Sequence, residues 1–328
     1  MNNNLKFVFD KYFVKKHSYE TVSVDGCMDV ALELSHWPGN KTPKELKADT
    51  ATEIAFNLIE RNPEKYFSNI KYITNNHLEA DGILAAYVLL YPEKALKFKK
   101  EFINSAIVSD FNEFIDEESI KTAVILDSLL DTTKNNLIFE DIKEKNPVEI
   151  IQIAYEKAFD LIPDVFSNSD KFGNIWREEI DLLNKSFSSF ESRISQISEY
   201  NDLNFTTYES NFLLSPYAKF SKTQNDIILN CVKQKGGYIF ILEYKPYTWF
   251  ETVSRKKFKR ASFASLAKLL NQKFNLSNPR FIEMGLNPEE DWDYKLVFAY
   301  EDLEYAVCPV ELYKIEKEIL EHLATETN

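Results

Sequence analysis

The chain of 328 residues has only seven glycines and three cysteines. It contains neither a P-loop nor a GxGxxG fingerprint, which argues against nucleotide binding by either of these glycine-rich routes. The cysteines (Cys27, Cys231 and Cys308) are far apart and odd in number. They therefore fit a reducing cytoplasm and give no disulfide framework or zinc-site spacing. The sequence also lacks the GxSxG and HExxH motifs of two large hydrolase classes.

The sequence has no hydrophobic run that approaches the length of a membrane span, and its first residues are polar. The net charge of −13 argues against binding to long duplex nucleic acid, which needs a broad basic face. A small phosphorylated substrate remains compatible, because metal ions and a local basic cluster can hold its charge. With 44% hydrophobic residues, the chain predicts a cytoplasmic globular protein large enough for two domains.

Apolar segments of two kinds alternate over residues 1–165. The pattern predicts helices at 50–61, 81–91, 93–100 and 148–162, and strands near 21–25, 31–35, 70–74, 104–108 and 122–127. Such alternation is typical of an α/β fold with a mostly parallel sheet and helices on both faces. We predict that residues 1–165 form this domain and that it binds metal.

The pattern of apolar and polar residues changes toward the C-terminus. An amphipathic stripe over residues 170–200 predicts a long helix, so residues 166–204 are expected to link the domains, and 201–211 reads as polar linker. Residues 205–328 predict a smaller α+β domain that binds substrate. Its expected elements are a strand at 238–244 pairing back through 247–253, a helix at 262–273, a strand at 294–300 and a helix at 309–324.

The segment 76–82 carries the clearest chemical signal. His77, Glu79 and Asp81 stand at alternate positions between a predicted strand and a predicted helix. In extended backbone alternate side chains point the same way, so the three head groups are expected to converge. Imidazole and carboxylate ligate zinc, manganese and iron. Gly82 is expected to let the backbone turn sharply into the helix.

A second segment, 34–40, contains His36 and is followed by Asp49 in front of the helix at 50–61. Further carboxylates follow predicted strands, and we favour Asp25 and Asp127 as ligands, with Asp110 behind them. Each aspartate also has a plainer interpretation as a residue of a turn or a helix N-cap that binds no metal, because Asp is common at both places. For His77 and Asp81 we favour a metal site, because burying an imidazole and a carboxylate beside an apolar strand without a partner is costly.

The segment 74–90 resembles motif I of the DHH phosphoesterase superfamily, a His-x-Asp-x-Asp pattern followed by Gly and a helix, with Glu79 replacing the first Asp. The segment 34–59 is similar to the Asp-His-His segment of that superfamily. Ser35 stands at the Asp, His36 at the first His, Trp37 at the second, and Asp49 at a metal-ligating Asp. The motif order is reversed, which implies a permuted relative, and the resemblance covers about residues 20–130. The His-Trp-Pro-Gly-Asn segment also resembles an uncharacterised bacterial family, which assigns no activity.

The resemblance implies a pair of divalent metals, usually Mn²⁺ with Zn²⁺ or Fe²⁺ as alternatives, and hydrolysis of a small phosphorylated or nucleotide-like substrate in a cleft between the domains. The expected metal ligands are His36, Asp49, His77, Glu79, Asp81, Asp127 and Asp25. His36, His77 and Asp81 would be catalytic, and the basic cluster of Arg255, Lys257 and Arg260 would bind substrate.

Two alternatives remain open. The departures at Ser35, Trp37 and Glu79 are also compatible with a catalytically degenerate DHH-like protein that binds a ligand or a partner. A metal-dependent enzyme acting on a substrate without phosphate is a third reading. The basic cluster has a plainer interpretation too, as a solvated loop.

Overall fold

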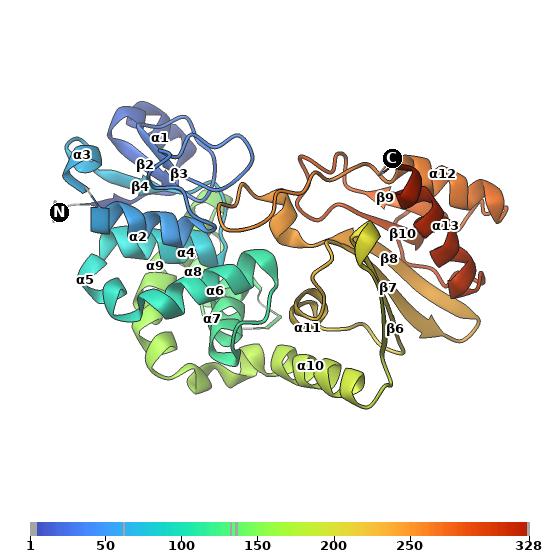
Figure 1. Cartoon of the computed structure of the whole chain (residues 1–328). Coiled ribbons are helices and arrows are strands. Elements are labelled where there is room, and N and C mark those ends of the chain that lie inside the picture. The colour runs from blue at the N-terminus through green and yellow to red at the C-terminus, as the bar shows by residue number, and fades with distance from the viewer. Residues whose placement is uncertain (1–4, 62, 132, 135–136, 327–328) are drawn as a thin grey trace. The chain divides into compact units, whose positions relative to one another are not determined.

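The computed structural model describes residues 5–61, 63–131, 133–134 and 137–326 (Figure 1). The chain divides into two compact units. Unit 1 comprises Met1–Asp181 together with Phe250–Lys256, and unit 2 comprises Leu182–Trp249 and Lys257–Asn328. The segment Phe250–Lys256 is called the strap below, because it belongs to unit 1 although it lies between the two parts of unit 2 in the sequence.

A four-stranded parallel sheet forms the centre of unit 1. Its order is β1 (Lys6–Phe7), β4 (Tyr72–Thr74), β2 (Thr21–Val24) and β3 (Leu32–Leu34). Every residue of β2 and β3 is buried, as expected for parallel strands covered on both faces. Because all the strands run the same way, the residues that follow β2, β3 and β4 meet at one edge of the sheet.

The rest of unit 1 consists mainly of helices. They are α1 (Lys11–Lys16), α2 (Ala51–Arg61), α3 (Pro63–Phe67), α4 (Ala80–Leu90), α5 (Pro92–Ala95), α6 (Lys99–Phe111), α7 (Glu117–Asp127), α8 (Phe139–Ile142), α9 (Pro147–Ser167) and the first part of α10 (Gly173–Glu191), with 3₁₀ turns at Ser18–Glu20, Leu96–Phe98, Ser128–Leu130 and Ser169–Phe172. α4 is buried along almost its whole length and packs between α2, α6 and α9. A helix that is apolar all round belongs in the interior, and α4 forms the centre of the core of unit 1.

Unit 2 contains a six-stranded mixed sheet. Its order is β5 (Gln196–Tyr200), β6 (Phe205–Ser210), β7 (Ile227–Gln234), β8 (Gly237–Tyr244), β10 (Lys295–Ala299) and β9 (Arg280–Met284). Only β6 and β7 pair in parallel. α12 (Ala264–Lys273) and α13 (Leu312–Glu326) cover one face and α11 (Pro216–Ser221) lies on the other, with 3₁₀ turns at Asn201–Leu203 and Pro246–Trp249 (Figure 1). The predicted fold class, α/β followed by α+β, is confirmed.

Several predicted elements were wrong. The segments expected as strands at 104–108 and 122–127 lie inside α6 and α7. A short buried run of apolar residues is compatible with a strand or with a helix. Here the side chain of Asp116 accepts a hydrogen bond from the backbone N–H of Ser119, and this N-cap begins the helix α7. The helix expected over 170–200 ends at Glu191, and the expected linker at 201–211 contains β6. Residues 247–253 form no hairpin strand: 247–249 end a 3₁₀ turn and 250–253 belong to the strap.

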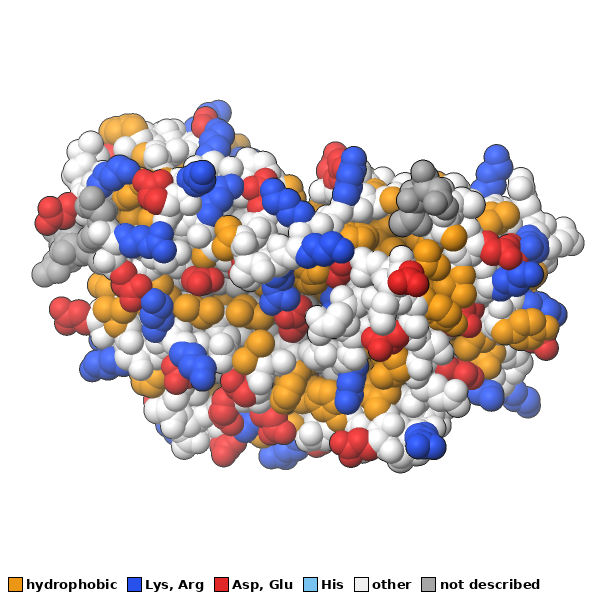
Figure 2. Space-filling view, viewed as in Figure 1, with side chains coloured by type: hydrophobic (Ala, Val, Ile, Leu, Met, Phe, Trp, Pro, Cys, Tyr) orange, Lys and Arg blue, Asp and Glu red, His pale blue; other side chains and the backbone are white. Residues whose placement is uncertain are grey.

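Acidic and basic side chains are interspersed over the face shown in Figure 2. Within the described part of the chain, no helix combines the length and the apolarity needed to cross a membrane.

Candidate metal centre

Three neighbouring strands deliver side chains to one edge of the unit 1 sheet. Asp25 directly follows β2, His36 lies two residues after β3, and His77 lies three residues after β4. Glu79 is the N-cap residue of α4 and Asp81 lies in its first turn. The three head groups of the 76–82 segment do not meet at one point as predicted: His77 and Glu79 lie together, whereas Asp81, in the first turn of the helix, lies with His36.

Asp25 lies between two groups of candidate ligands. Its Oδ1 is 3.4 Å from His36 Nε2, and its Oδ2 is 3.1 Å from His77 Nε2. Asp25, His36 and Asp81 form the inner group, and Asp25, His77 and Glu79 form the outer group. Within each group the ligand atoms all lie within 4.8 Å of one another. A carboxylate that presents one oxygen to each group has the arrangement of a bridging ligand.

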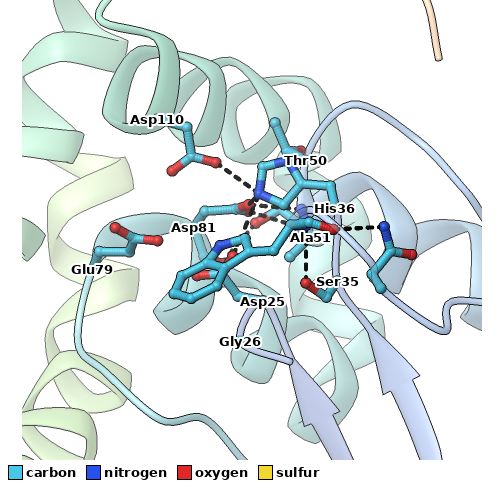
Figure 3. Close-up of polar contacts among 12 residues, drawn as sticks. Asp25, Gly26, Ser35, His36, Thr50, Ala51, Glu79, Asp81 and Asp110 are labelled. Atoms are coloured by element: carbon cyan, nitrogen blue, oxygen red, sulfur yellow. Dashed lines mark hydrogen bonds and ion pairs between the residues drawn. The ribbon is translucent and has the colours of Figure 1, made fainter. Parts of the chain in front are cut away.

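The inner group surrounds His36 Nε2 (Figure 3). This nitrogen is 3.5 Å from Asp81 Oδ2 and 3.2 Å from Asp110 Oδ2. His36 Nδ1 is 2.6 Å from the carbonyl oxygen of Asp49, which can only accept, so Nδ1 carries a proton. Nε2 is therefore turned toward three carboxylates, as in histidines whose second nitrogen is fixed by an outer partner.

The inner group fits a metal ion. Both carboxylate oxygens of Asp25, both of Asp110 and Nε2 of His36 are buried and lack a hydrogen-bond partner among the described residues. Burying such groups without compensation is costly, and a divalent cation among them would remove that cost. Atoms that each lie about 2.1 Å from one ion are about 3.0–3.4 Å apart in octahedral or tetrahedral geometry. The observed separations of 3.2–3.5 Å around His36 are close to this range.

The outer group is more open. His77 Nδ1 lies 2.6 Å from Asn76 Oδ1, and His77 Nε2 lies 2.7 Å from Glu79 Oε1. The side chains of His77 and Glu79 are 26% and 32% exposed, whereas those of His36, Asp25, Asp81 and Asp110 are fully buried. Solvent and small molecules can therefore reach the outer group, while the inner group is closed.

Burial and the neighbouring charges together shift the pKa values of the histidines and of several carboxyl groups in the two ligand groups. Burial alone would lower the pKa of both histidines, but the carboxylates outweigh it, raising the pKa of His36 well above its usual range and that of His77 to about 11. Burial would raise the pKa of Asp25, but His77 and His36 hold it well below the ordinary value. Burial raises the pKa of Glu79 to about 8 and that of Asp110 well above normal, helped by neighbouring carboxylates. Negative charge in excess is what a site for cations requires.

Asn75 holds the loops of the site together. Its Oδ1 accepts from the backbone N–H of Gly26 at 3.1 Å and that of Asn76 at 2.7 Å, and its Nδ2 donates to Tyr155 Oη. Tyr155 in turn donates to the carbonyl of His77. A Cβ on Gly82 would lie 2.2 Å from Asn75 Nδ2. Gly82 is therefore needed for close approach in a helix, and the sharp turn expected of it was wrong.

Two of the predicted ligands use their carboxylates elsewhere. Asp127 ends α7 and accepts from the backbone N–H of Ala80 at 2.6 Å and from Ser109 Oγ at 3.1 Å, which caps α4. Asp49 accepts from the backbone N–H groups of Val253 and Ser254 in the strap at 2.7 and 2.9 Å. Neither carboxylate belongs to the inner or the outer group.

The strap covers the inner group. The ring of Phe250 stacks on that of His36 with centroids 4.3 Å apart. The backbone N–H of Glu251 donates to the carbonyl of His36 at 2.7 Å, and its carboxylate accepts from Gly39 N and Asn40 Nδ2. Arg255 of the strap was predicted to bind substrate, but no sequence pattern indicated that Phe250 and Glu251 would contact His36.

The predicted basic cluster is divided between the two units. Arg255, in the strap, places Nη1 2.5 Å from Glu113 Oε1 and Nε 3.7 Å from Asp49 Oδ2. Arg260 is buried in unit 2, where its guanidinium donates to Thr248 and to backbone carbonyls, and Lys257 is exposed in the same unit. Arg255 is therefore the one of the three that belongs to the same unit as the metal-ligand groups.

Comparison with known proteins gives a family but no activity. The model of DUF6687, a family of unknown function, matches residues 6–285. The chain belongs to this family. No curated protein matches it. A solved structure, the pGpG-specific phosphodiesterase PggH from Vibrio cholerae, aligns over 93% of this chain and 83% of its own at 11% identity with a TM-score of 0.38, which is too low to carry an argument.

Asp110 was ranked behind the other candidates in the sequence, yet in this DUF6687 protein it lies beside His36. The signal was a carboxylate that follows a short, largely apolar run, but that run was predicted to be a strand and is part of α6. Trp37, the residue at the expected second His, packs its ring 4.9 Å from the ring of His77. It therefore packs against one side of His77 and offers no ligand atom.

Proposed function

We propose that this DUF6687 protein is a divalent-metal-dependent hydrolase that acts on phosphoesters of small phosphorylated or nucleotide-like molecules. The observation that carries the proposal is the position of Asp25, which presents one oxygen to each of two ligand groups while both its oxygens lack hydrogen bonds among the described residues. Two ions that share a carboxylate are a recurrent arrangement for hydrolysis of phosphate esters.

The donor set supports manganese, zinc or iron. His36 and Asp81, with Asp110 beside them, would hold an ion in the inner group; His77 and Glu79 would hold one in the outer group; Asp25 would serve both. Mixed imidazole and carboxylate sets suit these metals. When bound, such ions act as Lewis acids that activate water and neutralise charge developing on a phosphate.

The protein's own residues supply orientation. The backbone N–H groups of Ala51 and Thr52 at the start of α2 donate to the two oxygens of Asp81 at 2.6 and 2.7 Å and fix the plane of its carboxylate. The carbonyl of Asp49 and the amide of Asn76 hold the Nδ1 protons of the histidines, so each Nε2 faces its carboxylates. A substrate would approach the outer group, where the side chains reach solvent.

The choice of phosphoester rests on the resemblance of segments 74–90 and 34–59 to the DHH superfamily. The chain departs from that pattern at Ser35, Trp37 and Glu79, so the activity needs a direct test. Arg255 is the candidate for contacting an anionic substrate, since a guanidinium binds phosphate oxygens bidentately. Its present partners, Glu113 and Asp49, would have to share it.

The test combines metal content with hydrolysis. Protein purified without chelator and loaded with Mn²⁺ is assayed against bis(4-nitrophenyl) phosphate and short linear dinucleotides, in the wild type, His77→Gln and the control His17→Gln. His17 is a half-buried histidine of the same unit, paired with Glu20. We expect His77→Gln to lower the rate by more than about 100-fold, beyond the loss typical of an outer-shell partner, and His17→Gln to leave it unchanged. Equal rates in both variants would refute the proposal.

The second candidate, a metal-binding protein without catalysis, is favoured by the closure of the inner group. Structural metal sites are closed, whereas catalytic ones keep a position open. His36 is fully buried under Phe250, and Trp37 packs on His77. Near-stoichiometric metal without hydrolysis of any substrate above background would support this candidate.

A further inference from the structure

A pocket of about 430 Å³ lies in unit 2, where the start of α13 meets β5 and β6. It is built within one unit and is separate from the residues of the candidate metal centre. Its floor is formed by strand residues, and its wall includes Leu312, Tyr313 and Glu316 of α13.

The floor is a polar interruption of an otherwise apolar sheet face. Phe205, Thr207 and Glu209 of β6 alternate onto one face, and Phe205 belongs to the core beneath α12 and α13. On β7 the partners of Thr207 and Glu209 are apolar core residues, Leu229 and Cys231. On β5 they are Ser198 and Gln196. The inner face therefore changes from apolar to polar at the pocket.

The hydroxyl of Thr207 is independent evidence for a ligand, because it lacks a hydrogen-bond partner in the described part of the chain. Its side chain is only 3% exposed, it lines the pocket, and its Oγ1 has no hydrogen-bond partner among the described residues. Buried hydroxyls are nearly always hydrogen-bonded, so an unpaired one facing a pocket calls for a ligand group.

The charge of the pocket is negative. Glu209, Glu311 and Glu316 line it, and its lining includes neither Lys nor Arg. Glu311 already forms an ion pair with Lys314 at 2.6 Å, whereas Glu209 and Glu316 have no cationic partner among the described residues. Glu209 accepts from Tyr238 Oη at 2.9 Å, which orients one of its oxygens.

A metal ion is a poor match for these carboxylates. In the described part of the chain, the sets of three ligand atoms close enough for one ion both lie in unit 1. The acidic groups of the pocket are spread more widely, over a volume that suits an organic molecule. Tyr238 and Tyr313 add aromatic rings, which attract cations through their faces.

We propose that this pocket binds an organic ammonium ligand of the diamine or polyamine type, with Glu209 and Glu316 as the acidic partners and Thr207 as a neutral acceptor. An ammonium group carries three donors and no acceptor, and this site offers it acceptors from the floor and from α13. The aliphatic stem of the ligand would lie along Tyr238, Tyr313 and Leu312.

The test is isothermal titration of the full-length protein with spermidine and putrescine at 0.15 M salt. The variants are Glu316→Gln and Thr207→Val, and the control is Glu321→Gln, an exposed residue of α13 outside the pocket that pairs with Lys317. We expect saturable one-site binding in the wild type and in the control. Each pocket variant should weaken it by about tenfold or more, as the loss of a charge-assisted hydrogen bond implies.

Thr207→Val also separates binding from folding. Because its hydroxyl is unpaired, replacing it with an isosteric apolar group should leave the ligand-free unfolding temperature unchanged or raise it. An absence of saturable binding to either amine would overturn the proposal. So would an equal loss in Glu321→Gln and Glu316→Gln, which would indicate general attraction to an acidic protein, or saturable Ca²⁺ binding that Glu316→Gln abolishes.

Discussion

Asp25→Asn should abolish binding of both proposed metal ions while leaving unit 1 folded. Asp25 has a left-handed backbone conformation, with φ of 65°. Asn tolerates this region as Asp does and has nearly the same shape, so the substitution removes charge without adding backbone strain. A substitution by alanine would combine the loss of charge with backbone strain, so the two effects could not be separated.

The size of the effect follows from linkage. A metal present at 100 times its dissociation constant adds about 2.7 kcal/mol to the free energy of unfolding. For a unit of this size, each kcal/mol raises the unfolding temperature by roughly 2–4 °C, so each Mn²⁺ ion should raise that of the wild type by about 5–11 °C and two ions together by about 11–22 °C. Because Asp25 faces both groups, the variant should show a shift near zero and not half the wild-type value.

The assay is calorimetric unfolding with and without Mn²⁺, together with metal analysis of the purified protein. The matched control is Asp29→Asn, an exposed aspartate close in sequence whose only ion-pair partner among the described residues is Lys41. A variant at Asp25 that retains half of the metal and half of the shift would show that one group binds without it. Retention of all the metal would refute the bridging role.

Three further predictions concern pH, the strap and a glycine. Without metal, burial raises the pKa of Glu79 from 4.5 to about 8, and Asp25 and Glu79 outweigh burial to raise that of His77 from 6.5 to about 11. The folded state then holds protons that the unfolded state has lost, so the free energy of unfolding should fall as pH rises through these windows. Since metal ions must displace those protons, the affinity for Mn²⁺ should rise with pH. Calorimetric titration with Mn²⁺ in buffers of different ionisation enthalpy should show that Glu79→Gln releases one proton fewer than the wild type. Asp49→Ala should free the strap at a cost of about 1–3 kcal/mol and speed tryptic cleavage within it, while Asp49→Asn, which keeps one acceptor, should be cleaved at an intermediate rate; equal rates in all three proteins would contradict this. Gly82→Ala should destabilise the protein and reduce metal binding although Ala favours helices, whereas Gly173→Ala, where the closest atom to the added Cβ is the end of the flexible Arg177 side chain and Trp176 is at ordinary contact distance, should be neutral or stabilising in thermal unfolding.

The sequence predicted the parts of the site that depend on local pattern. His77 and Glu79 follow a strand and precede a helix, and alternation alone brings them together. Asp25 and His36 were placed at strand ends, and parallel pairing of β2 with its neighbours then brings those ends to one edge. The α/β character also followed from the alternation of elements.

Other parts depend on packing that one chain does not reveal. Asp110 is brought to His36 by the way α6 packs on α4 and α7, and an apolar run cannot distinguish a buried strand from a buried helix. Asp49 looked like a ligand because of its position before α2, but its carboxylate serves the strap. That contact joins residues 204 positions apart, and no local signal encodes it.

The strap also sets an order of assembly. During synthesis, His36 and Asp49 are made roughly 200 residues before the segment that covers them. Closing a loop of that length costs roughly 2.7 kcal/mol more chain entropy than closing one of ten residues, unless unit 2 has already folded and shortened the path. If the rest of unit 1 folds before the strap docks, the carboxylates of the inner group are in place but uncovered at that stage, and an ion could enter freely. Once the strap is in place, exchange of that ion should require it to open, so the metal acquired early in the life of the protein would tend to be the one it keeps.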